Sequence, residues 1–136
     1  SVMGGAVVFS GQLLPLLDFP LDFDYVHVSR YRDARQGGAV HWKVAPCENV
    51  RGRVVLLLDD ILDEGHTLAA LRERVMALGA SRFYSAVFAD KRHGKDKPIH
   101  ADFVGLELPD RFVFGYGMDY KGYWRNANGI FAVKGM

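Results

Sequence analysis

A run of apolar residues crosses the middle of the chain from Val54 to Leu58 without interruption. Such a run predicts a strand that is buried on both faces, as in a parallel sheet. A helical pattern follows, and its apolar face is formed by Leu68, Leu71, Val75 and Leu78. Gly79 stands where a glycine commonly ends a helix, and Phe83–Ala89 is the next apolar strand. Strand, helix and strand at this spacing predict a right-handed parallel βαβ unit.

Shorter elements are predicted on either side of this unit. Ala6–Leu17 has the pattern of an apolar helix, which Pro15 must kink or shorten. Five further strands are predicted from short apolar or alternating runs: Phe23–Val28, Ala39–Ala45, Phe103–Leu106, Phe112–Tyr116 and Ile130–Val133. We expect a polar loop between the first two of these strands. A turn at Pro109 and Asp110 is expected between the third and the fourth.

The composition is that of an ordinary globular domain. Of the 136 residues, 49% are hydrophobic and 24% are charged, and the net charge is +1. This balance argues against an extended nucleic-acid surface, and no stretch has the length of a membrane span or the pattern of a signal peptide. The single cysteine, Cys47, excludes an internal disulfide and an all-cysteine metal site. We expect one domain over residues 1–136, located in the cytoplasm, without nucleic-acid or membrane partners.

The candidate chemistry lies directly after the central strand. Asp59 and Asp60 follow the apolar run, Asp63 comes after two more apolar residues, and the turn continues to Thr67. A strand-to-helix turn aims backbone N–H groups and a helix N-terminus at one place, which favours an anion such as phosphate. Gly65 permits a tight backbone there, and the Thr67 hydroxyl is available to a phosphate oxygen.

Three interpretations of these acids are open. Solvated side chains with a helix N-cap suit Asp63 alone better than three acids around an anion site. The magnesium site of a nucleotide hydrolase needs a Gly-Lys-Ser/Thr phosphate loop, which the sequence does not contain. In the third interpretation the turn holds a monophosphate, Asp59 and Asp60 accept hydrogen bonds from a sugar diol, and Asp63 takes a proton. Only the third interpretation accounts for all of these residues.

The stretch Val54–Thr67 resembles the phosphoribosyl-pyrophosphate (PRPP) signature of the type I phosphoribosyltransferases. That signature is a hydrophobic strand, two acids, two apolar residues, Asp, usually Thr, Gly, any residue and Thr. The whole chain resembles the hypoxanthine-guanine branch of the family. Its other matching segments are Val2–Gly5, Lys91–Arg92, Asp102–Glu107, and Phe112–Asp119 continuing to Arg125. Their order and spacing agree from end to end.

The resemblance implies an α/β fold with a doubly wound, mostly parallel sheet and a small C-terminal hood. It implies a purine-salvage enzyme that transfers the phosphoribosyl group from PRPP to hypoxanthine or guanine with Mg²⁺, giving IMP or GMP and pyrophosphate. A homodimer or homotetramer is a family expectation. A xanthine preference, a non-catalytic PRPP sensor and an inactive or partial product of a longer chain are the alternatives. The retention of Asp63 favours an enzyme over a sensor.

The resemblance also implies roles for single residues. Asp63 would be the general base, and Asp59 and Asp60 would hold the ribose hydroxyls near the metal. The 5′-phosphate would be bound by the turn residues Asp63, Glu64, Gly65, His66 and Thr67. Pyrophosphate would be bound by Met3, Gly4, Gly5 and Arg125. The purine would be bound by Lys91, Phe112, Val113 and Asp119, the last also helping to place Mg²⁺ through water.

Several features depart from the family pattern or qualify it. Met3 stands where Lys is frequent, and Glu64 replaces the usual Thr. The pair Arg30 and Tyr31 stands where Ser-Tyr is common, at the tip of a loop that would close over the site and exclude water. A non-proline cis peptide is expected between Val2 and Met3. The chain opens directly on this turn, so a preceding helix and strand of the family are expected to be missing.

Overall fold

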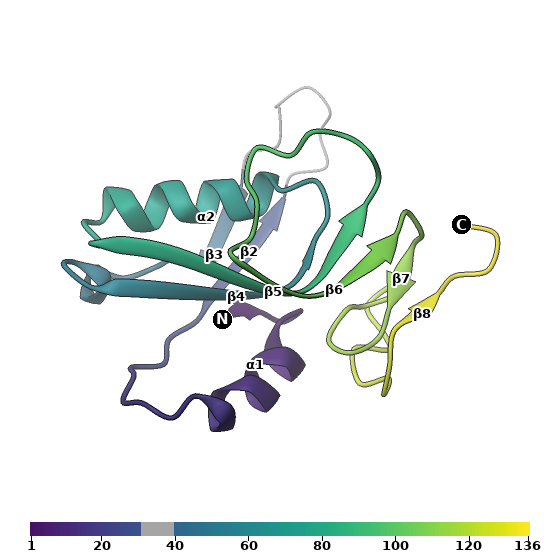
Figure 1. Cartoon of the computed structure of the whole chain (residues 1–136), viewed down its shortest axis with the longest axis horizontal. Helices are drawn as coiled ribbons and strands as arrows, with labels where there is room; N and C mark the ends of the chain where they lie inside the picture. Colours follow the sequence, from purple (N-terminus) through teal and green to yellow (C-terminus); the bar gives the residue numbers. More distant parts are fainter. Residues whose placement is uncertain (31–39) are drawn as a thin grey trace.

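The computed structural model describes residues 1–30 and 40–136, and at its centre lie three parallel strands in the order β4–β5–β6 (Figure 1). Their bounds are β4 Val54–Leu62, β5 Arg82–Arg92 and β6 Phe103–Pro109. Each strand is found where the sequence pattern predicts it but continues three or four residues further at its carboxyl end. The strands are longer because backbone pairing between parallel strands continues past each apolar run into the polar residues that follow. Between β4 and β5 this pairing extends as far as Leu62, which lies beside Asp90.

The burial of β4 differs from the prediction at its start. Val54 is 62% exposed and Leu56 is 37% exposed, whereas Leu57 and Leu58 are buried. The expectation of a strand buried on both faces is therefore wrong for the first half of β4. It holds near the carboxyl end, where the candidate acids begin.

Three more strands extend this arrangement. β1 Val2–Met3 pairs in parallel with β2 Val26–Arg30, which pairs antiparallel with β3 Val40–Val44. β1 also lies beside β4, so the two groups of strands adjoin each other. The strand predicted at Phe23–Val28 begins three residues later than expected, because pairing with β1 starts only at Val26.

Helices lie on both sides of the strands, as Figure 1 shows. α2 His66–Ala77 connects β4 to β5 and covers one face, while α1 Val7–Leu13 lies on the other. The helix predicted at Ala6–Leu17 ends early, and Pro15 falls in a short 3₁₀ turn, η1 Leu14–Leu16. A second 3₁₀ turn, η2 Glu48–Val50, precedes β4. The predicted doubly wound α/β class with a mostly parallel sheet is confirmed.

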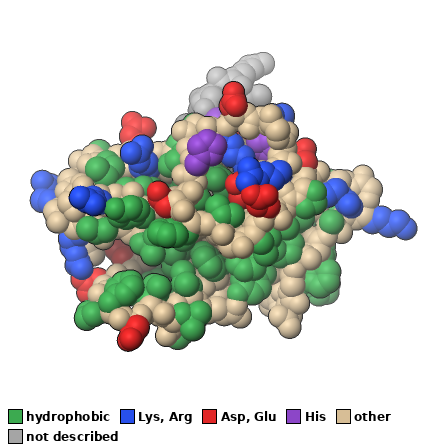
Figure 2. All heavy atoms as spheres, viewed as in Figure 1, with side chains coloured by type: hydrophobic (Ala, Val, Ile, Leu, Met, Phe, Trp, Pro, Cys, Tyr) green, Lys and Arg blue, Asp and Glu red, His purple; other side chains and the backbone are tan. Residues whose placement is uncertain are grey.

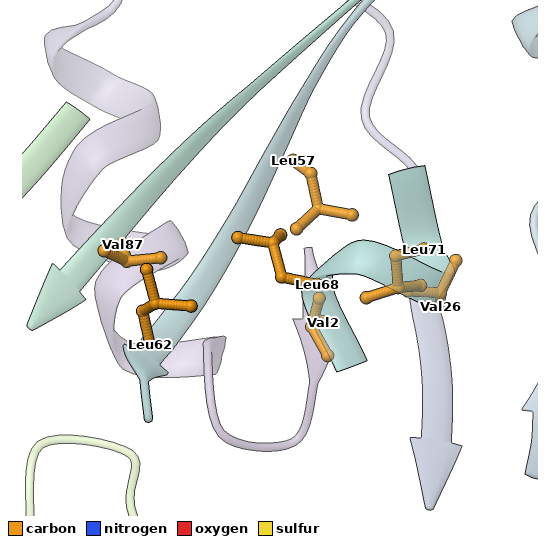
Figure 3. Packing of buried hydrophobic residues seen from close by; sticks show 7 residues of the cluster. All are labelled: Val2, Val26, Leu57, Leu62, Leu68, Leu71 and Val87. Atoms are coloured by element: carbon orange, nitrogen blue, oxygen red, sulfur yellow. The ribbon is translucent and has the colours of Figure 1, made fainter. Parts of the chain in front are cut away.

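The core is formed between α2 and the strands. Its buried side chains come from β1, β2, β4, β5 and α2: Val2, Val26, Leu57, Leu62, Leu68, Leu71 and Val87 (Figure 3). Burial of one such aliphatic side chain contributes about 1.5–3 kcal/mol to folding. Leu62 and Leu68 flank the turn between β4 and α2, so the core fixes both ends of the segment that carries the candidate chemistry.

The C-terminal segment forms a small unit beside β6 (Figure 1). Within it, β7 Val113–Phe114 pairs antiparallel with β8 Phe131–Ala132. Both strands are shorter than predicted. β6 pairs with β5 and β7 with β8, so the predicted turn at Pro109 and Asp110 joins two sheets and makes no hairpin. Across the described residues, no helix has the length and apolar character needed to cross a membrane.

Candidate active site

A cavity of about 340 Å³ opens at the carboxyl end of β4. Its walls come from the Val2–Gly5 turn, from β2, from the segment between Asp59 and Leu68, and from the C-terminal unit. Most of the predicted site residues line it: Met3, Gly4, Gly5, Asp59, Asp60, Asp63, Glu64, Gly65, His66, Thr67, Asp119 and Arg125. Open α/β sheets bind ligands at this edge, where strand ends and helix N-termini meet.

The turn between β4 and α2 has the backbone of an anion site. Gly65 precedes the first helical residue with a φ of +91°, a conformation that suits glycine. Among the described residues, no side chain caps the N-terminus of α2, and no acidic residue lies in the first turn of this helix. The N–H groups there, together with the helix dipole, therefore favour an anion in the cavity.

Two side chains of this turn, at positions 64 and 66, line the cavity and are also exposed to solvent. Glu64 and His66 are both more than half exposed, and His66 Nε2 lies 3.9 Å from Glu64 Oε2. The acid of Glu64 is thus adjacent to an imidazole. The backbone N–H groups of the turn do not depend on the side chain at position 64.

Asp59 and Asp60 are held in place by the backbone that follows each of them. The N–H of Asp60 donates to Asp59 Oδ1, and the N–H of Ile61 donates to Asp60 Oδ1, both at 2.8 Å. Burial raises the pKa of Asp59 well above its usual range, and the neighbouring charge of Asp60 adds to the rise. Asp60 also lies against Gly5, because a Cβ added to that glycine would fall within 2.7 Å of Asp60 Cγ.

The turn after β1 contains the expected non-proline cis peptide, but at a different bond. The cis peptide joins Met3 to Gly4, so the predicted position between Val2 and Met3 is wrong by one residue. A cis bond brings its two Cα atoms close together, and Gly4 has no side chain to crowd that of Met3. The turn faces the cavity and lies near Arg125, whose Nε would be 3.9 Å from a Cβ on Gly4.

Asp63 lies at the opening of the cavity and is contacted by two basic side chains. Its side chain is 48% exposed, and Oδ2 accepts a hydrogen bond from Lys91 Nζ at 3.1 Å. Lys91 lies within β5, not after it as predicted, and its side chain is 11% exposed. His93 was given no role by the sequence, yet its Nε2 lies 2.9 Å from the backbone oxygen of Asp63.

The C-terminal unit supplies Asp119 and Arg125. Arg125 Nη1 donates to the backbone oxygen of Gly117 at 2.8 Å, and its Nη2 lies 3.7 Å from Asp119 Oδ1. The N–H of Gly122 donates to Asp119 Oδ2 at 2.9 Å. Both side chains remain a little under half exposed, so they can reach a ligand in the cavity.

The predicted purine-binding residues are only partly brought together. Lys91 reaches the site through Asp63, whereas Phe112 and Val113 lie in the C-terminal unit outside the cavity lining. Phe112 is 45% exposed and meets the ring of Tyr120 edge-on, with ring centroids 6.0 Å apart. Tyr31 lies outside the described residues, and Arg30 is described only as the last residue of β2.

The donor set fits a Mg²⁺ ion that is shared with a substrate. Among the described residues, no three His, Cys, Asp or Glu side chains cluster closely enough to hold a metal by themselves. Mg²⁺ commonly takes only one or two carboxylates and fills its other positions with water and substrate phosphates. Asp59, Asp60 and Asp119 line one cavity and offer such carboxylates.

Comparisons with known proteins agree with this geometry. Residues 1–121 match the family model of the phosphoribosyl transferase domain. The chain is 37% identical to the hypoxanthine-guanine phosphoribosyltransferase of Bacillus subtilis, over 98% of its own length and 74% of the relative's.

Solved structures give the same result. The hypoxanthine phosphoribosyltransferase of Trypanosoma cruzi, as a mutant in a ternary substrates complex, is 28% identical and superposes with a TM-score of 0.90 over 98% of this chain and 74% of that one. The same mutant in complex with the product IMP gives a TM-score of 0.88 at 28% identity, over 98% of this chain and 70% of that one.

Proposed function

Because the chain belongs to the phosphoribosyl transferase family, we propose that it transfers the 5-phosphoribosyl group of PRPP to hypoxanthine or guanine. The products are IMP or GMP and pyrophosphate, a purine-salvage reaction. The observation that carries this proposal is that the β4–α2 turn, the acids of β4 and the Val2–Gly5 turn line the same cavity. Its chemistry suits a phosphate, a ribose diol and a pyrophosphate side by side.

PRPP is held at both of its ends. The 5′-phosphate accepts hydrogen bonds from the backbone of the turn around Gly65 and from the Thr67 hydroxyl, at the N-terminus of α2. Asp59 and Asp60 accept hydrogen bonds from the ribose hydroxyls. Fixing the sugar between these groups lowers the entropy cost of reaching the reactive arrangement.

The leaving pyrophosphate is bound by the turn of Met3, Gly4 and Gly5 and by Arg125. Arg125 Nη1 is bonded to Gly117, which leaves other N–H groups of the guanidinium for the anion. Mg²⁺, held by substrate oxygens together with Asp119 through water and near Asp59 and Asp60, would neutralise part of the charge that develops on the pyrophosphate. In this role Met3 contributes only its backbone, since it lacks the charge of the Lys that is frequent at its position.

The purine is bound between β5 and the C-terminal unit. Phe112 stacks on the ring, Val113 meets the ring edge through its backbone, and Lys91 donates to the oxygen at position 6. Lys91 has three N–H donors and uses one on Asp63 Oδ2, so it can serve both groups at once. Asp119 meets the base from the other side.

The proposed transfer at the sugar carbon requires no covalent bond between the substrate and the protein. The bond from the sugar carbon to purine N9 forms as the bond to pyrophosphate breaks, and the electron pair of the latter leaves with pyrophosphate. Asp63 takes the proton from N7 as a general base.

The test is pyrophosphate release from PRPP and Mg²⁺ with hypoxanthine, guanine, xanthine or adenine, for the unmodified chain and for Asp63→Asn. Turnover with hypoxanthine and guanine but not adenine, slowed by about 10²–10⁴ in the variant, supports the proposal and the role of Asp63. A preference for xanthine would change the substrate. PRPP binding without turnover on any base would indicate a sensor and overturn the enzymatic function.

A further inference from the structure

The segment after β5 folds back over the end of β4 and brings a histidine to Asp63. In Figure 2, histidine and charged side chains gather near the top of this face, and the surface below them is mainly hydrophobic. The His93 side chain is only 6% exposed. Its Nδ1 accepts a hydrogen bond from the Lys95 N–H at 3.2 Å, so the ring proton is on Nε2. Nε2 therefore donates to the Asp63 backbone oxygen at 2.9 Å.

The hydrogen bond from His93 fixes the backbone of Asp63, which lies beyond the paired part of the sheet. The ladder between β4 and β5 ends with Leu62 beside Asp90, so Asp63 comes directly after the last paired residue of β4. Its side chain is nearly half exposed and has Lys91 as its hydrogen-bond partner. The distance from His93 Nε2 to Asp63 Oδ1 is 3.7 Å, too long for a hydrogen bond. His93 therefore acts on the backbone of Asp63 and leaves its carboxylate to other groups.

The segment that carries His93 is itself anchored to both strands. The Lys97 side chain is 8% exposed, and its Nζ donates to the backbone oxygens of Leu62 and Lys91 at 3.1 and 2.7 Å. The third N–H of the ammonium group bonds to Asp90 Oδ1 at 2.6 Å. All three donors are used, and they join the carboxyl ends of β4 and β5. The segment that places His93 next to Asp63 is therefore anchored to the ends of both strands by Lys97.

We propose that His93 is a positioning residue for Asp63: it fixes the backbone at this strand end so that the carboxylate faces the purine proton. The inference rests on the proposed function, since it assigns Asp63 as the general base. Proton transfer requires the base within hydrogen-bond reach of the proton, and an error of about 1 Å can cost about a hundredfold in rate. Without the His93 bond, Asp63 can turn toward solvent.

Two substitutions of His93 test whether its hydrogen bond to Asp63 matters, or only the space that its side chain fills. In His93→Gln, the side-chain amide reaches the position of Nε2 and can still donate to the Asp63 oxygen. In His93→Asn, the amide reaches only as far as Nδ1 and that hydrogen bond is lost. His100→Asn makes the same change at an exposed histidine on the same segment and serves as the control. Melting temperatures of all three variants check that each is folded.

The decisive measurement is a double-mutant cycle with Asp63→Asn, using kcat and KM for hypoxanthine and PRPP. We expect His93→Asn to lower kcat by about tenfold to a hundredfold, and His93→Gln to restore most of it. In the Asp63→Asn background the same change should alter kcat by no more than about twofold, the margin of independent sites. The KM for PRPP should also stay within about twofold of the unmodified value.

The outcomes distinguish the inference from the function beneath it. An unmodified chain without turnover overturns the proposed function itself. A turnover that His93→Asn leaves unchanged overturns the positioning role alone. The role is likewise overturned if His93→Asn slows the reaction equally in the Asp63→Asn background, because the effect then does not pass through the carboxylate.

Discussion

Gly117 lies where the C-terminal unit meets the proposed pyrophosphate turn. Its N–H donates to the Arg125 oxygen at 2.7 Å, and its own oxygen accepts from Arg125 Nη1 at 2.8 Å. Its φ is +98°, and a Cβ at this position would collide with the backbone oxygen of Gly5 and lie 3.2 Å from its carbonyl carbon. Gly117→Ala therefore presses directly on the turn that we propose binds pyrophosphate.

The size of the effect follows from two separate costs. Placing alanine at a positive φ costs about 1–2 kcal/mol of stability wherever it occurs. Because real Cβ atoms essentially never come within 3.0 Å of another heavy atom, the two backbones must also separate by roughly 1 Å. A displacement of about 1 Å at a reacting group can cost a hundredfold in kcat/KM, or about 2.7 kcal/mol of transition-state stabilisation.

Gly52→Ala is the matched control for this substitution. Gly52 also has a positive φ, +71°, but a Cβ there would meet nothing within 4 Å. Both variants should lose stability, measured by thermal unfolding, whereas only Gly117→Ala should lose kcat/KM for PRPP. If Gly117→Ala keeps the PRPP kinetics of the control, the contact with Gly5 does not shape the pyrophosphate turn and the reasoning fails.

The remaining predictions concern charged groups. Lys97→Met leaves Asp90 buried without its ion-pair partner and should cost about 3–5 kcal/mol of stability, which lowers the melting temperature by about 10–17 °C. The control is Lys95→Met at an exposed lysine, and an equally small loss of stability in both variants would contradict the anchoring role of Lys97. Burial raises the pKa of Asp59, so the folded chain binds this proton more tightly and loses stability as pH rises through the carboxyl range. The melting temperature of Asp59→Asn minus that of the unmodified chain should therefore increase as pH rises from about 4 to 7 in Mg²⁺-free buffer. A difference that stays constant with pH would argue against the raised pKa of Asp59. Lys91→Gln should reduce the ratio of kcat/KM for hypoxanthine to that for adenine by about tenfold or more, since a charge-assisted hydrogen bond contributes about 1.5–3 kcal/mol. An unchanged ratio would exclude Lys91 from purine recognition.

The sequence was informative where the chemistry depends on neighbouring residues. The turn after Asp63 is built from consecutive positions, and its glycine lies directly before the helix. α2 begins at His66, two residues before the helical pattern that was predicted to start at Leu68. Strand ends were placed less well, because ladder pairing with neighbouring strands decides them. Asp59, Asp60 and Lys91 belong to strands for that reason.

Contacts between distant segments had no signal in the sequence. His93 and Lys97 stand in a basic stretch that has the composition of a solvated loop, yet both are largely buried because the segment folds back onto the ends of β4 and β5. Gly117 gives no sign of its contact with Gly5, more than a hundred residues away. In each case the course of the backbone in the folded chain decides which residue is contacted, and the periodicity of apolar and polar residues does not indicate that course.

The charge of the cavity bears on how an anionic substrate could enter it. Among the described residues that line it, the acids are Asp59, Asp60, Asp63, Glu64 and Asp119, whereas Arg125 is the one Lys or Arg. The pairing of Asp63 with Lys91 reduces this excess of negative charge without removing it. PRPP free of cations would therefore meet repulsion from these carboxylates, and a Mg²⁺ ion on its phosphate oxygens would turn that repulsion into attraction. The acidic lining is thus better suited to a metal-bound PRPP than to the free anion.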